Sequence, residues 1–192
     1  MQIEYEATFP DVEKEVVREK LKQAGAVLVR PEFLQKRVVF DMPLGHELAG
    51  GWVRVRDEGD RVTMSIKIVS GDKIDDQKEM CLTVDSFEQG EAFLTTLGCR
   101  KKSYQETKRE LWTLDGTEIT IDEWPFLNPF VEVEGKSEAM VKRVAERIGF
   151  DYRQALFGAV DVLYIRQYPH LTFKRINKTP RIVFAGENSF LN

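Results

Sequence analysis

Two short stretches of the sequence each carry a pair of glutamates separated by one residue. Glu4 and Glu6 form the first pair, and Glu132 and Glu134 form the second. Because residues i and i+2 of a β-strand share a face, each pair would project from one side of a strand. Four carboxylates aimed into one space repel one another unless a cation such as Mg²⁺ neutralises them. The pairs alone are equally compatible with glutamates that face water on two half-exposed strands.

Other expected strands carry charged side chains on one face and apolar side chains on the other. Their polar faces hold Arg54, Arg56, Ser65, Lys67, Glu79, Arg109 and Asp122. Arginine and lysine bind phosphate oxygens through charge-assisted hydrogen bonds, and carboxylates bind Mg²⁺ or Mn²⁺. Such a metal ion bridges phosphate oxygens and stabilises the charge that develops in phosphoryl or nucleotidyl transfer. The plainer alternative is an open sheet whose polar face is solvated and laced with ion pairs.

The order of the expected elements indicates an α+β fold. Alternation of apolar and polar residues predicts strands at 2–9, 26–41, 52–56, 61–69, 77–84, 104–113, 118–122 and 130–135. We expect Pro31 to interrupt the second of these strands. Helical periodicity predicts a helix capped by Asp11 and further helices at 85–97, 138–148 and 153–166. If helices cover the apolar faces, the strands could close into a barrel with a charged interior.

The composition limits the class of protein. The chain has 192 residues, a net charge of −4 and 42% hydrophobic residues. This composition fits a globular domain, and the charge is too mild to argue for a nucleic-acid-binding protein. No apolar run approaches the roughly 20 residues that span a bilayer, and the N-terminus lacks the pattern of a signal peptide. Cys81 and Cys99 are the only cysteines, so we expect reduced thiols and a cytoplasmic protein.

The last part of the chain, residues 169–192, is basic in its first half. The sequence leaves three roles open for this extension: it folds over a mouth of the barrel, contributes to a homodimer contact, or is disordered. We therefore predict a principal domain over residues 1–168, followed by an extension of unknown role.

Several segments resemble motifs of the CYTH domain, the family named for class IV adenylyl cyclases and thiamine triphosphatases and also called triphosphate tunnel metalloenzymes. The segments are IEYEAT at 3–8, FDMP at 40–43, WVRVR at 52–56, SIK at 65–67, TKRELW at 107–112 and ITIDEWPFLNPFVEVE at 119–134. In the family's order, they resemble its ExExK signature, a strand end, the paired-arginine strand, the strand with a phosphate-binding lysine, the KxR strand and the closing acidic region. The resemblance covers about residues 1–165.

The resemblance implies an eight-stranded antiparallel β-barrel that forms a tunnel with flanking helices, with the CYTH domain at residues 1–168. It implies that Mg²⁺ or Mn²⁺ is held by carboxylates, namely Glu4, Glu6, Asp122, Glu132 and Glu134. It assigns catalysis to Glu4, Glu6, Arg54, Arg56, Lys67 and Arg109. Its substrate-binding set comprises Arg54, Arg56, Lys67, Arg109, Lys36 and Glu79.

Three residues depart from the family's pattern. Thr8 and Thr107 stand where the resemblance predicts lysines, and Asn128 stands in place of a glycine. A lysine or arginine contact to phosphate can contribute roughly 1.5–3 kcal/mol, so the missing lysines would weaken phosphate binding. The candidates to replace them are Lys36, Lys102, Lys108 and Lys174.

The leading interpretation is a metal-dependent enzyme that acts on a triphosphate such as ATP, thiamine triphosphate or tripolyphosphate. It would either cyclise ATP to cAMP and pyrophosphate or hydrolyse the terminal phosphate. The segments at 77–85 and 107–112 are more similar to class IV cyclases than to thiamine triphosphatases, which favours cyclisation. The alternative is a non-catalytic module that binds a nucleotide or polyphosphate. We expect no membrane or nucleic-acid partner, and a homodimer stays open.

Overall fold

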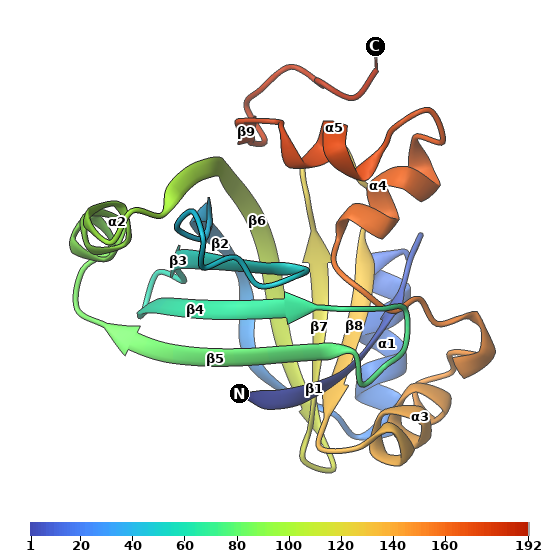
Figure 1. Ribbon diagram of the computed structural model, residues 1–192. Coiled ribbons are helices and arrows are strands. Elements are labelled where there is room, and N and C mark those ends of the chain that lie inside the picture. Colours follow the sequence, from blue (N-terminus) through green and yellow to red (C-terminus); the bar gives the residue numbers. More distant parts are fainter. Residues whose placement is uncertain (192) are drawn as a thin grey trace.

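The computed structural model describes residues 1–191 and consists of a closed eight-stranded antiparallel β-barrel with one extra strand and five helices (Figure 1). The barrel strands are β1 (Gln2–Phe9), β2 (Val27–Asp41), β3 (Gly51–Asp57), β4 (Val62–Val69), β5 (Gln77–Val84), β6 (Arg100–Leu114), β7 (Thr117–Glu123) and β8 (Phe130–Gly135). The helices are α1 (Lys14–Ala24), α2 (Phe87–Thr96), α3 (Glu138–Arg147), α4 (Asp161–Gln167) and α5 (Phe173–Asn177), and the extra strand is β9 (Arg181–Ile182). The predicted α+β barrel with flanking helices is confirmed.

The order of the strands brings the two glutamate pairs together. The strands pair in the order β2-β3-β4-β5-β1-β8-β7-β6, and pairing of β6 with β2 closes the barrel. The first strand, β1, therefore lies between β5 and β8. Within this arrangement Glu6 lies opposite Glu134, and Thr8 lies opposite Glu132. Two segments more than a hundred residues apart in the chain thus form one wall of the barrel.

Alternation along the strands sends polar side chains into the barrel and apolar side chains outward. In β4, for example, Thr63, Ser65 and Lys67 are buried, whereas Met64 and Ile66 on the other face are half-buried. Successive side chains of a strand point to opposite faces, so one register places all of the polar set inside. This alternation is the physical basis of the charged interior.

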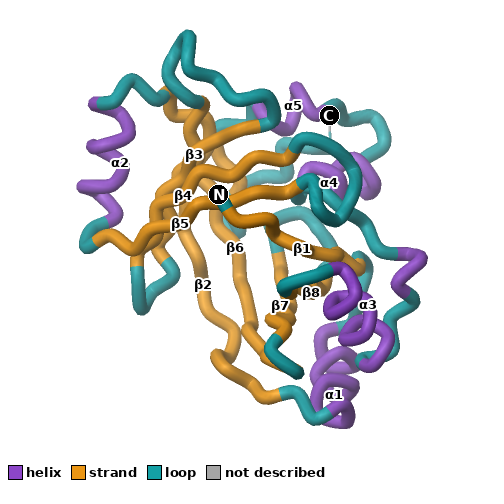
Figure 2. Tube along the Cα trace, turned by 60° about the horizontal axis from the view of Figure 1, so that its bottom comes forward, coloured by secondary structure: helices purple, strands orange, loops and turns teal. Residues whose placement is uncertain are grey.

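Three apolar cores connect the helices to the barrel. The largest packs α1 and α3 against the outer faces of β1, β7 and β8, which lie side by side in both views (Figures 1 and 2). On the other side of the barrel, α2 packs on β3. The third core joins α4, α5 and β9 to the segment that connects β7 and β8. No helix within residues 1–191 is long and apolar enough to cross a membrane.

Two expectations about β2 and α1 are wrong. Pro31 does not interrupt β2, because register shifts between Leu28 and Phe33 let the strand continue past a residue that lacks an N–H donor. Asp11 does not cap α1: its φ of 57° places it in the left-handed region, and Glu13 occupies the N-cap position without a side-chain hydrogen bond. Asp11 instead accepts a hydrogen bond from Asn128.

The helix predicted at 153–166 is also wrong in extent. A short 3₁₀ turn at Tyr152–Gln154 is separated from α4 by an irregular segment. Gly158 in this segment has a φ of 114°, which a helix cannot accommodate. The break matters because it lets residues 156–160 cross the end of the barrel, where Leu156 exchanges backbone hydrogen bonds with Thr8.

Candidate functional site

A cavity of about 270 Å³ lies inside the barrel and is lined by strands from its whole circumference. Nearly all of the charged residues singled out in the sequence line it, namely Glu4, Glu6, Arg54, Arg56, Lys67, Glu79, Arg109, Glu132 and Glu134. Residues of α4, α5 and β9 line one end. The cavity therefore has charged side walls and an end wall contributed by the C-terminal part of the chain.

The carboxylates gather on the wall formed by β1, β8 and β7. Glu6, Glu134 and Glu118 lie abreast on these three neighbouring strands, and directly opposed side chains of adjacent strands stand about 5 Å apart. Burial and the nearby charges of Glu6 and Glu118 raise the pKa of Glu134 to about 7. Burial, followed by the charges of Glu6 and Asp122, raises the pKa of Glu132. This wall carries more negative charge than its surroundings neutralise.

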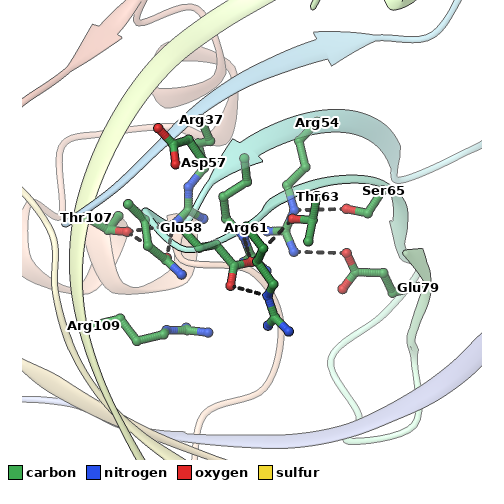
Figure 3. Close-up of polar contacts among 12 residues, drawn as sticks. Arg37, Arg54, Asp57, Glu58, Arg61, Thr63, Ser65, Glu79, Thr107 and Arg109 are labelled. Atoms are coloured by element: carbon green, nitrogen blue, oxygen red, sulfur yellow. Dashed lines mark hydrogen bonds and ion pairs between the residues drawn. The ribbon is translucent and has the colours of Figure 1, made fainter. Parts of the chain in front are cut away.

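Most of the other charges form ion pairs between strands that are two positions apart in the barrel. Lys67 Nζ lies 2.9 Å from Glu4 Oε2, and Arg54 Nη2 lies 2.9 Å from Glu79 Oε1. Burial raises the pKa of Glu4 to about 8 although Lys67 opposes the shift. Arg54 also donates a hydrogen bond of 3.0 Å from Nε to Ser65 Oγ (Figure 3). The cations expected to bind phosphate and the carboxylates expected to bind a metal ion are thus engaged with one another.

Arg109 contacts two carboxylates at once. Its guanidinium donates two hydrogen bonds to Asp122, at 2.7 and 2.8 Å, and one to Glu132, at 2.7 Å. Asp122 is fully buried and also accepts a hydrogen bond of 2.6 Å from Thr120. Unlike the four glutamates, Asp122 does not line the cavity. It lies behind Arg109 and holds the guanidinium in place.

The carboxylates fit a divalent cation by their chemistry. They are hard oxygen donors, and burial is the main cause of the raised pKa values of Glu4, Glu132 and Glu134, with neighbouring carboxylates adding to it. A divalent cation would stabilise the charged forms of these groups. Within residues 1–191, however, no three acidic, histidine or cysteine side chains already surround one point as a metal site. Glu4 and Glu132 would first have to exchange their contacts with Lys67 and Arg109.

The residues proposed to replace the missing lysines lie in different places. Lys36 is exposed on the outer face of β2, because its neighbours Gln35 and Arg37 take the inward positions. Lys102 lines the cavity, whereas Lys108 forms an ion pair with Glu123 and does not line it. Lys174 is exposed on α5. Of the four lysines, only Lys102 is near enough to the cavity to contact a ligand there.

Sequence reasoning missed Arg37 and Glu118, both of which line the cavity. Arg37 on β2 lies beside Thr107 of β6, with Arg109 and Arg54 around the same space (Figure 3). The expected interruption at Pro31 hid the alternation of Gln35, Arg37 and Val39 that would have placed Arg37 inside. Glu118 shares a face with Asp122, so the same parity argument could have found it.

The C-terminal extension covers one end of the barrel. β9 pairs with β6 in parallel, and the backbone N–H of Tyr104 donates to Pro180 O at 2.9 Å. Ile176 and Ile182 line the adjacent end of the cavity. Residues 169–191 therefore fold over a mouth of the barrel, while residue 192 lies outside the described part. The domain boundary at residue 168 stays a prediction.

Comparisons with known proteins agree with this architecture. A family model for the CYTH domain matches residues 2–161. A search of curated proteins found no significant match.

Solved structures share the fold at low sequence identity. A Pyrococcus horikoshii protein has a TM-score of 0.70 at 18% identity, covering 84% of this chain and 99% of its own. A Vibrio parahaemolyticus protein assigned provisionally as an adenylate cyclase has a TM-score of 0.71 at 12% identity, covering 84% and 97%. A Hippeastrum protein described as having a dominant triphosphatase activity has a TM-score of 0.59 at 13% identity, covering 90% and 98%. Because the CYTH family model spans most of the sequence, the chain belongs to the CYTH-domain family.

Proposed function

We propose that this protein is a divalent-metal-dependent enzyme that acts on a triphosphate inside the barrel. The observation that carries the proposal is one cavity with a carboxylate wall on β1, β8 and β7 and a cationic lining from β2, β3, β4 and β6. The CYTH family includes adenylyl cyclases and triphosphatases, which supports an activity of this class. The substrate would be ATP, thiamine triphosphate or tripolyphosphate.

In the proposed mechanism, Arg54, Arg56, Lys67 and Arg109 bind and orient the phosphates. Mg²⁺ or Mn²⁺, when bound by Glu4, Glu6, Glu132 and Glu134, would withdraw negative charge from the phosphate oxygens. Phosphates that bind Lys67 and Arg109 would release Glu4 and Glu132 from their ion pairs. Substrate binding and the freeing of the carboxylates are therefore coupled in this account. Asp122 acts by keeping Arg109 in position.

Two reactions are compatible with such a site. In an adenylyl cyclase, the 3′-hydroxyl of ATP attacks the α-phosphorus, and pyrophosphate leaves. In a triphosphatase, water attacks the terminal phosphorus, and orthophosphate leaves. We place cyclisation first, on the similarity of the segments at 77–85 and 107–112 to class IV cyclases. The ³¹P spectrum of a reaction with ATP separates the two, because only cyclisation releases pyrophosphate together with cAMP.

A non-catalytic role is the second candidate. It is favoured by Thr8 and Thr107 at positions where lysines were expected and by carboxylates engaged in ion pairs rather than grouped around one point. Such a module would bind a nucleotide or polyphosphate without converting it. We also propose a cytoplasmic location, which rests on the free thiols of Cys81 and Cys99.

A turnover assay with Mg²⁺ and Mn²⁺ tests the enzymatic proposal directly. We expect release of phosphate or pyrophosphate from at least one of ATP, thiamine triphosphate and tripolyphosphate. Glu134→Gln should abolish the activity, because it removes a carboxylate proposed to bind the metal ion. The variant should stay folded, because the pKa of Glu134 is raised and its charged form is disfavoured by burial. Glu19→Gln, at an exposed site on α1, is the matched control and should be fully active. Binding without turnover of any substrate would favour the non-catalytic module.

A further inference from the structure

Arg37 differs from the other three arginines that line the cavity in having no carboxylate partner among the described residues. Arg54, Arg56 and Arg109 each form an ion pair with a carboxylate. Arg37 is only 5% exposed, yet within residues 1–191 it forms no ion pair. Its Nη2 donates to the neutral oxygens Gln35 Oε1 at 2.9 Å and Thr107 Oγ1 at 2.6 Å. Its Nε has no hydrogen-bond partner among the described residues.

This arrangement is costly for the free protein. A buried charge without a counter-charge loses its hydration, which contacts with neutral groups replace only in part. Burial and the nearby positive charges of Arg54, Arg56 and Arg109 all lower the pKa of Arg37. A guanidinium stays charged at neutral pH even so, because its reference pKa is far above 7. The region around Arg37 is therefore a place of positive potential that an anion would relieve.

The surroundings of Arg37 hold its side chain in a defined orientation. The ring of Trp124 lies over the guanidinium, with the ring centre 4.7 Å from Arg37 Cζ. Gln35 and Thr107 fix Nη2 from the side of β2 and β6. A guanidinium that is fixed in this way, with an unused donor, is pre-organised to bind planar or tetrahedral oxyanions.

We propose that Arg37 is a ligand-binding residue of the cavity and that a phosphate group of the triphosphate is the anion it binds. The inference rests on the proposed function, and it adds to the cation set a residue from β2, a strand that contributes no other cation to the cavity. The Arg37 guanidinium donates to a phosphate oxygen, while Thr107 and Gln35 position it. Arg37 thereby supplies a charge close to where Thr107 replaces the expected lysine.

Calorimetric titration with tripolyphosphate and Mg²⁺ tests this assignment. Arg37→Gln should weaken binding by roughly tenfold to a hundredfold, the range for hydrogen bonds to charged groups. Lys78→Gln removes one positive charge from the exposed outer face of β5 and should leave the affinity unchanged. Affinity for tripolyphosphate in Arg37→Gln equal to that of the wild type would overturn the proposal.

The stability of the free protein separates ligand binding from a structural role. The buried charge of Arg37 costs stability, whereas its contacts with Gln35, Thr107 and Trp124 add some, so Arg37→Gln should melt close to the wild-type temperature. A markedly lower melting temperature together with unchanged affinity for tripolyphosphate would show that Arg37 only supports the fold, and it would contradict the proposal.

A second measurement uses the wild-type protein and stays informative if the variant fails to fold. In an NMR titration with tripolyphosphate and Mg²⁺, the Nε–Hε signal of Arg37 should shift in step with saturation. Binding of tripolyphosphate without any change in this signal would exclude Arg37 and leave the proposed function standing. If the wild-type protein binds none of tripolyphosphate, ATP and thiamine triphosphate, the proposed function fails with it, so the two failures are distinguishable.

Discussion

Several charged side chains of the cavity neutralise one another in ion pairs between nearby strands. Lys67 with Glu4, and Arg109 with Glu132, join a cation expected to bind phosphate to a carboxylate expected to bind a metal ion. A metal–triphosphate complex would replace both partners at once, because it presents anionic oxygens and a cation together. The same residues therefore neutralise one another in part in the free protein and form the binding groups for the complex.

The contact between Arg109 and Asp122 gives a prediction at this scale. Arg109→Gln should destabilise the fold by about 3–5 kcal/mol, because it leaves the fully buried Asp122 carboxylate without its cation. The double variant with Asp122→Asn should recover most of the stability while tripolyphosphate binding stays weak. Urea denaturation and calorimetry measure the two effects. Equal stability of Arg109→Gln and wild type would contradict this account of Asp122.

The sequence identified most of the charged residues that line the cavity, because strand alternation determines which side chains share a face. It failed at Lys36 and Arg37, which are adjacent on β2. Lys36 was expected to contact substrate and points outward, whereas Arg37 points inward. Residues 26–41 were expected to form strand at both ends with an interruption at Pro31, and no inward face was assigned to the second half, whereas the strand continues past Pro31 through register shifts. Irregular backbone of this kind has no clear signal in a single sequence.

At the scale of elements, the turn between β3 and β4 contains a buried carboxylate with a structural role. Glu58 accepts hydrogen bonds from Arg56 Nε at 2.8 Å and Arg61 Nε at 2.9 Å, and it is 3% exposed (Figure 3). Burial alone would raise the pKa of Glu58, but Arg56 and Arg61 outweigh it, so the pKa lies below its ordinary value of 4.5. The turn therefore depends on the ionised form of Glu58.

A pH-dependent stability follows from this lowered pKa. A group whose pKa is lower in the folded state adds stability above its unfolded pKa, and this stability is lost as the pH falls through the folded pKa. Glu58→Gln should therefore lower the free energy of unfolding by about 1–3 kcal/mol at pH 7, with a smaller difference below pH 4. Urea denaturation at both pH values measures it, and a difference independent of pH would contradict the assignment.

The C-terminal segment is a second element whose role can be tested. Phe190 is fully buried, and its ring centre lies 4.6 Å from that of Tyr164 on α4. Phe190→Ala should destabilise the protein by about 3–5 kcal/mol, as expected for a large buried ring. The neighbouring Leu191 is 66% exposed, so Leu191→Ala serves as the control and should have little effect. Equal stability of both variants in urea denaturation would show that the segment does not support the barrel.

For the whole molecule, closure of the barrel depends on contacts that local sequence cannot specify. Strand positions followed from alternation, but the pairing of β2 with β6 joins residues about 70 positions apart along two long, bent strands. The covering of one barrel mouth by residues beyond the CYTH match was left open for the same reason. Local patterns predict which elements form, whereas burial of apolar surface between distant elements decides how they assemble.

The central claim is that the barrel cavity binds a triphosphate together with a divalent cation. Calorimetric titration of the wild-type protein with tripolyphosphate, with and without Mg²⁺, tests it most directly. We predict saturable binding that is stronger with Mg²⁺ and at least roughly tenfold weaker in Arg54→Gln, which loses a charge-assisted contact. Absence of binding to the wild-type protein, or equal binding by Arg54→Gln, would contradict the claim.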